Sequence, residues 1–229
     1  MLSAAETEKK LNNTLNNLSK LDQVAARKFL SEIQSECDVT FHEGKPLHEL
    51  SYNRQSEAFS RWFCKNVLDI LPDDVDNVIA IDHSNDYGID MFHIETKGET
   101  YEQYIAWGQT KFSSSLDYEV SIKVILVHEN TIKYLEDVSK CPNANNEFKH
   151  ASRDFVKEGG LDASLRKLIY FVVAGDLAPQ AQTEFDQFKS RLENQSHKGG
   201  EIIVELYNLE RILKNITDPI TPEVEIEFD

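Results

Sequence analysis

The spacing of apolar residues divides the first third of the chain into two helices and a loop. Apolar residues recur mostly at steps of three and four over residues 4–35 and again over residues 54–71, which predicts two amphipathic helices. Pro72 is expected to end the second helix, because proline cannot continue one. Residues 38–47 contain a glycine and a proline and are expected to form a loop.

Shorter apolar runs then predict strands. Residues 77–81 fit a short buried strand, and residues 89–95 and 101–111 fit two more. Lys97 and Gly98 mark a turn between the last two strands, which are therefore expected to pair as a hairpin.

Residues 116–138 admit two interpretations. Apolar residues at helical spacing predict a long helix, with Ser114 and Asp117 as a capping box at its start. The apolar run at residues 124–127 fits a strand instead, and the pattern does not decide between the two.

The last part of the chain alternates strand and helix. Strands are expected at residues 168–174 and 202–206, and helices at residues 179–194 and 209–216. Strand, helix and strand at this spacing predict a parallel unit with a right-handed crossover. The whole order indicates an α/β fold.

Three segments are expected along the chain. Residues 1–50 would be an N-terminal helical extension, and residues 51–217 would form an α/β domain. Residues 218–229 contain two prolines and then alternate like the start of a strand, which suggests a linker and the beginning of a further C-terminal domain.

Composition narrows the class of protein. The chain has 229 residues, of which 40% are hydrophobic and 28% charged, as in globular proteins. Its net charge of −16 counts against tight, non-specific DNA binding by this chain alone. Three scattered cysteines and the absence of any apolar run of about 18 residues predict a cytoplasmic protein that has buried thiols and does not enter a membrane.

The candidate chemistry lies in residues 86–112. Asp90 follows a glycine turn, and Gln109 and Lys111 lie two residues apart on the next strand, so the latter two side chains point to one face. Strand pairing would bring Asp90 beside them. Asp90, Gln109 and the backbone carbonyl of Thr110 would offer oxygen ligands to Mg²⁺ or Mn²⁺. Lys111 would orient the attacking water or neutralise charge on a phosphate.

A second carboxylate would strengthen such a metal site. Glu57 is the best candidate, because it lies in the first turn of the helix predicted at residues 54–71. An acid in the first turn of a helix is also favoured by the helix dipole alone, so both roles stay open. Asp82 and Asp86, which flank the turn before Asp90, are weaker candidates.

These residues resemble a known family. Gly88-Ile89-Asp90, a hairpin and Gln109-Thr110-Lys111-Phe112 follow a helix that bears Glu57-Ala58-Phe59. This order resembles the PD-(D/E)XK nuclease superfamily, in particular the abortive-phage-infection (AIPR) proteins and the Mrr-like restriction nucleases. In element order the resemblance extends over about residues 54–215.

The resemblance implies a restriction-endonuclease-like three-layer core, in which helices flank a mixed central sheet, together with a divalent metal and DNA cleavage. Asp90 would be the metal-ligating acid, Gln109 the variant of the second acid and Lys111 the catalytic lysine. Glu57 would match the helix glutamate often found near the metal. The chain departs from the family at Tyr87, where glycine is common, and at Met91, where a small residue is common.

The sequence therefore supports two main hypotheses. The first is a Mg²⁺-dependent DNA endonuclease domain in phage defence or restriction. The second is a nuclease-like domain of weak or no activity that binds nucleic acid or a partner protein, since Gln109 stands where an acid is expected. A third hypothesis is an interaction domain whose long N-terminal helix forms a homodimer. The plainest alternative for the motif is a surface hairpin with Gln109 and Lys111 in solvent.

Overall fold

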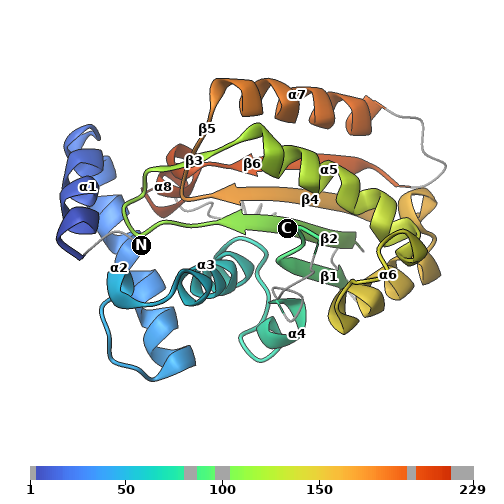
Figure 1. The fold of residues 1–229 in the computed structure, drawn as a ribbon, viewed down its shortest axis with the longest axis horizontal. Coiled ribbons are helices and arrows are strands. Elements are labelled where there is room, and N and C mark those ends of the chain that lie inside the picture. The colour runs from blue at the N-terminus through green and yellow to red at the C-terminus, as the bar shows by residue number, and fades with distance from the viewer. Residues whose placement is uncertain (1–3, 80–86, 96–103, 195–199, 218–229) are drawn as a thin grey trace, which may run out of the picture.

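The computed structural model describes residues 4–79, 87–95, 104–194 and 200–217, and helices cover both faces of a mixed sheet (Figure 1). This arrangement confirms the α/β class. The helices are α1 (Ala4–Asn16), α2 (Lys20–Phe41), α3 (Tyr52–Asn66), α4 (Val75–Ile79), α5 (Ile122–Glu136), α6 (Asn146–Lys157), α7 (Pro179–Asn194) and α8 (Leu209–Thr217). The strands are β1 (Met91–Glu95), β2 (Tyr104–Lys111), β3 (Tyr118–Val120), β4 (Arg166–Val173), β5 (Gly175–Leu177) and β6 (Ile202–Tyr207).

The main sheet has the strand order β1-β2-β4-β6. β1 and β2 are antiparallel, with Met91 opposite Gly108, which confirms the hairpin; its turn at Lys97 and Gly98 lies outside the described residues. β4 is parallel to β2 and to β6, and α7 lies between β4 and β6 in the chain. The predicted parallel strand–helix–strand unit is therefore confirmed. β3 and β5 form a separate parallel pair.

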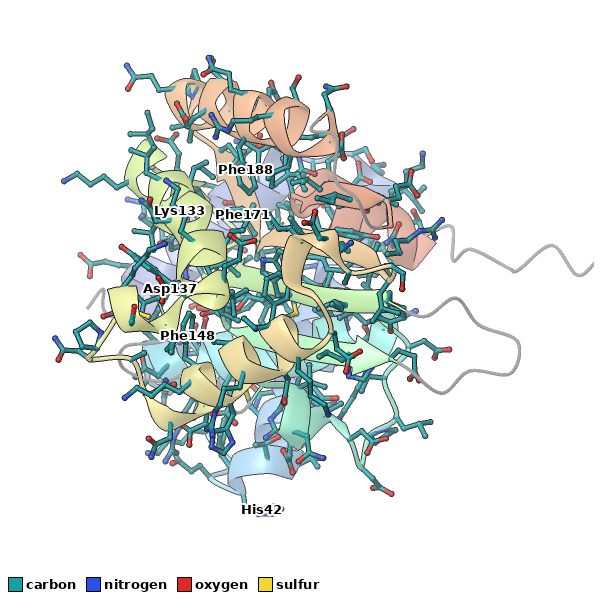
Figure 2. The ribbon with its side chains drawn as sticks, turned by 90° about the vertical axis from the view of Figure 1, so that its right-hand side faces the viewer. His42, Lys133, Asp137, Phe148, Phe171 and Phe188 are labelled. Atoms are coloured by element: carbon teal, nitrogen blue, oxygen red, sulfur yellow. The ribbon has the colours of Figure 1, made fainter. Side chains whose placement is uncertain are left out.

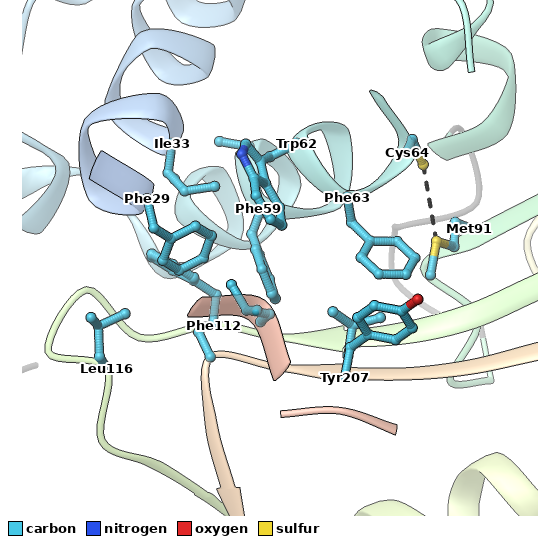
Figure 3. Packing of buried hydrophobic residues seen from close by; sticks show 14 of the residues in the cluster. Phe29, Ile33, Phe59, Trp62, Phe63, Cys64, Met91, Phe112, Leu116 and Tyr207 are labelled. Carbon is cyan, nitrogen blue, oxygen red and sulfur yellow. Dashed lines mark hydrogen bonds between the residues drawn. The ribbon is translucent and has the colours of Figure 1, made fainter. Parts of the chain in front are cut away.

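Two hydrophobic clusters hold the helices on the sheet. The first cluster joins α2, α3 and α8 to one face, and Phe29, Phe59 and Tyr207 lie within it (Figure 3). The second joins α5, α6 and α7 to the other face, where Phe171 of β4 and Phe188 of α7 are both buried (Figure 2). The N-terminal helices α1 and α2 contribute to the first cluster, so the predicted helical extension shares its core with the α/β domain.

The single helix expected over residues 4–35 is two helices. Ser19 caps α2: its hydroxyl accepts a hydrogen bond from the Asp22 N–H (3.2 Å) and donates one to the Asp22 carboxylate (2.7 Å). This capping box starts a new helix where the apolar spacing alone predicts continuity. α2 also continues through Phe41, into the expected loop, and ends where His42 adopts a left-handed backbone with φ 53°.

Two further predictions about the region after α3 are wrong. α3 ends at Asn66, before Pro72, because Asp69 adopts a left-handed φ of 55° and turns the chain away. The strand expected at residues 77–81 is helical in its described part: residues 77–79 belong to α4, and residues 80 and 81 lie outside the described residues. An apolar run this short suits a buried helical turn as well as a buried strand, so its spacing does not distinguish the two.

The region 116–138 combines both of the expected structures in a different order. Its first residues form β3, and α5 follows, so the strand alternative at residues 124–127 is wrong and the helix is shorter than predicted. The expected capping box does not start a helix, because the Asp117 carboxylate accepts the Ser115 hydroxyl within a turn. The sequence pattern also missed α6, β3 and β5.

Other expectations agree with the structure. α7 has the predicted bounds 179–194, α8 covers residues 209–216, and β4 and β6 overlap the strands predicted at 168–174 and 202–206. The three cysteines are free and buried, as their scattered positions predict. None of the helices in the described part of the chain has the length and apolar character to cross a membrane.

Candidate functional site

A tight turn brings Asp90 to the start of β1. Tyr87 and Gly88 both have left-handed backbones, with φ of 53° and 84°. A Cβ atom on Gly88 would lie 3.0 Å from Val127 Cγ1 and 3.1 Å from Gln109 Nε2. Glycine is therefore needed at this position for its backbone conformation and for the space it leaves to Gln109.

Hydrogen bonds to β2 fix the Asp90 carboxylate. The Asp90 N–H donates to the Gly108 carbonyl (2.9 Å), and Asp90 Oδ2 accepts from the Thr110 N–H (2.5 Å) and the Thr110 hydroxyl (3.2 Å). Asp90 is 4% exposed. Since the N–H and C=O of a strand residue point to the same side, the Thr110 carbonyl faces the edge of the strand where Asp90 lies.

Lys111 completes an ion pair with this carboxylate. Its Nζ lies 3.6 Å from Asp90 Oδ2, and its side chain is 18% exposed, three times as much as the 6% of the Asp90 side chain. The structure thus brings together the acid and the lysine that the sequence singled out. Lys111 is the member of the pair that is more open to solvent.

Gln109 follows Gly108, the residue that pairs with Met91 and whose carbonyl accepts from the Asp90 N–H. It is 5% exposed, and its side-chain oxygen Oε1 is buried without a hydrogen-bond partner among the described residues. A buried acceptor left unsatisfied costs about 1–3 kcal/mol. Gln109 therefore offers a free oxygen at the position that the motif assigns to a metal ligand.

Helix α3 adds hydroxyl groups that the sequence analysis missed. The Ser60 and Thr110 hydroxyls lie 2.8 Å apart, and the Ser60 hydroxyl also donates to the Ser56 carbonyl (3.1 Å). Ser60 and Thr110 are both fully buried. The Ser60 hydroxyl thus contacts the Thr110 hydroxyl that donates to Asp90. In the sequence, the signal for this contact is the pair Ser56 and Ser60, which lie four residues apart on an otherwise apolar helix face.

Tyr52, in the first turn of α3, also lies near the carboxylate. Its pKa is raised above the ordinary value by burial of the hydroxyl, then by the neighbouring Tyr118 phenol and by the negative charge of Asp90. The side chain as a whole is 45% exposed. Tyr52 therefore keeps its hydroxyl protonated at neutral pH, and the residue remains partly accessible to solvent.

Glu57 is not joined to this group. Its carboxylate accepts hydrogen bonds from Arg61, at 3.3 Å from Nε and 3.2 Å from Nη2, and Arg61 also bonds Asp76 (2.6 Å). Among the described contacts, none connects Glu57 to Asp90. Asp82 and Asp86 lie outside the described residues.

The site has one carboxylate at its centre. Within the described ranges, no group of three or more His, Cys, Asp or Glu side chains is arranged to hold a metal ion. Comparisons with protein-family models, curated proteins and solved structures found no match to this chain. Its function must be inferred from the chemistry of Asp90, Gln109, Thr110 and Lys111.

Proposed function

We propose that this chain is a Mg²⁺-dependent DNA endonuclease domain of the PD-(D/E)XK type, acting in phage defence or restriction. The observation that carries the proposal is the Asp90–Lys111 pair, 3.6 Å apart, together with the buried, unpartnered oxygen of Gln109, two residues before Lys111 on β2. The resemblance of the surrounding motif to AIPR and Mrr-like nucleases supports the same assignment.

The residues at the site fit a hard divalent cation. Asp90, Gln109 and the Thr110 carbonyl would hold it, and all three offer oxygen, the ligand atom that Mg²⁺ and Mn²⁺ prefer. The buried Gln109 oxygen lacks a partner within the described structure, so ligation would satisfy it. When bound, the ion would neutralise phosphate charge and lower the pKa of a bound water.

The protein's own groups have separate tasks in this proposal. The Thr110 N–H and hydroxyl hold the Asp90 carboxylate in one orientation, so it does not reorganise when substrate arrives. Lys111 places a positive charge at the more accessible side of the pair, where it would hold the attacking water or stabilise charge on the phosphate. Glu57 pairs with Arg61, and we leave it out of the proposed ligand set.

A second function is favoured by the burial of the site. Asp90 and Gln109 are 4% and 5% exposed, and an amide takes the place of the second acid. A nuclease-like domain that binds nucleic acid or a partner protein without cutting it would have these properties. Metal binding separates the two functions, since only the enzyme requires it.

Metal-dependent cleavage tests the proposal. We expect the purified chain to cut plasmid and single-stranded DNA in Mg²⁺ or Mn²⁺ and to lose this activity in EDTA. Asp90→Asn, purified in parallel, is the control for contaminating nucleases, because asparagine keeps an acceptor for the Thr110 N–H but removes the charge. Equal cleavage by the Asp90→Asn protein, or by the wild type in EDTA, would contradict the proposal.

A further inference from the structure

A small cavity of about 260 Å³ lies beside the end of β2. The first turn of α3 forms one wall with Tyr52 and Gln55, and β3 contributes Tyr118. The turn after β2 forms another wall with Ser113 and Ser114. Pockets for drug-sized ligands usually exceed about 300 Å³, so this cavity suits a smaller, flat group.

Besides His48, the lining of this cavity is rich in neutral hydrogen-bonding groups. No Asp, Glu, Lys or Arg is among its lining residues in the described part of the chain. Tyr52 and Tyr118 supply partly exposed aromatic surface, and Ser113 and Ser114 supply hydroxyls. Aromatic rings with neutral polar groups suit a nucleobase, whereas a phosphate would need positive charge.

The cavity is joined to the proposed active site by the chain itself. Phe112 and Ser113 directly follow Lys111 in the chain, so the cavity lies at the end of the strand that carries the proposed catalytic lysine. Tyr52 connects the two places, because it lines the cavity and the negative charge of Asp90 contributes to the raised pKa of its hydroxyl. A nucleic acid with a phosphate at Lys111 would therefore present a neighbouring nucleotide to the cavity.

Because the protein is strongly negative, its affinity for DNA would depend on contacts to bases, such as those in the cavity, more than on contacts to phosphates. With a net charge of −16, the chain is poorly suited to hold DNA through many phosphate contacts. Stacking on aromatic side chains provides affinity that does not depend on positive charge. We propose that the cavity binds the base of an unpaired nucleotide next to the scissile phosphate, an inference that rests on the proposed nuclease function.

Binding in EDTA tests this inference without cleavage. The probe is a short, fluorescently labelled single-stranded DNA of mixed sequence, compared with the same strand carrying abasic sites. We expect Tyr52→Leu to weaken binding of the intact strand by about tenfold or more, and Tyr52→Phe, which keeps the ring, to retain it. Ser114→Leu, which fills the cavity, should also weaken binding, whereas Ser35→Leu on the exposed surface of α2 should not.

Salt dependence gives an independent readout. We expect wild-type affinity to fall by less than about tenfold between roughly 50 and 200 mM salt, as few phosphate contacts would allow. Tyr52→Leu binding as tightly as wild type, equal binding of the abasic strand, or no binding by wild type would each overturn the inference. Its failure is separable from failure of the nuclease proposal, because Mg²⁺-dependent cleavage is measured on its own. Base-dependent binding without cleavage would support the cavity and refute the enzyme.

Discussion

Lys111→Met is expected to reduce DNA cleavage by about 10²- to 10³-fold, the usual cost of removing one group that stabilises charge in a transition state. Methionine keeps most of the side-chain length but removes the ammonium that lies 3.6 Å from Asp90 Oδ2. Asp90 would keep its two hydrogen bonds from Thr110, so unfolding free energy should fall by only about 1–3 kcal/mol.

A matched control separates catalysis from stability. Lys65→Met removes a comparable ion pair, since Lys65 Nζ lies 2.7 Å from Glu36 Oε2 and its side chain is 24% exposed. Lys65 joins α2 and α3 away from the site, so its loss should lower stability by a similar amount and leave cleavage near wild type. Steady-state rates of DNA cleavage by the two variants distinguish catalysis from stability. They are measured at a temperature at which circular dichroism shows that both variants are folded. Undiminished cleavage by Lys111→Met would refute the proposed mechanism.

Gln109→Glu is expected to make the chain less stable without metal and to bind Mn²⁺ at least about tenfold more tightly. The new carboxylate would be buried next to Thr110, the residue that binds the Asp90 carboxylate, and two like charges in such a place repel and lose hydration. A cation would relieve both costs, and ligand binding to the folded state raises the melting temperature. Thermal unfolding in EDTA and in Mn²⁺ measures both effects.

Gln109→Leu provides the opposite change at the same position. Leucine removes the unpartnered Oε1 atom, so stability in EDTA should stay equal or rise. Its response to Mn²⁺ should be weaker than that of the wild type, because one ligand oxygen is gone. If the Glu and Leu variants both respond to Mn²⁺ as the wild type does, Gln109 has a packing role only.

The motif residues were predictable because they depend on local geometry. Gln109 and Lys111 share a face by strand alternation, and the hairpin that pairs β1 with β2 brings Asp90 to Thr110 and Lys111. The bounds of α7 follow from apolar spacing in the same way. The strand expected at residues 77–81 failed because a run of four apolar residues, 78–81, has no period that separates helix from strand.

The remainder of the site depends on tertiary packing that the sequence does not encode locally. The apolar face of α3 is broad, so its rotation relative to the sheet was undetermined. In the structure, Ser60 faces Thr110, whereas Glu57 is turned toward Arg61. Tyr52 reaches the site because the helix begins there, two residues earlier than predicted.

Mn²⁺ titration by calorimetry measures whether Asp90 and Gln109 lie at a divalent-metal site. We expect saturable binding to the wild-type chain that is lost in Asp90→Asn, with both proteins folded by circular dichroism. Absence of Mn²⁺ binding to the folded wild type, or equal binding by the Asp90→Asn protein, would contradict this expectation.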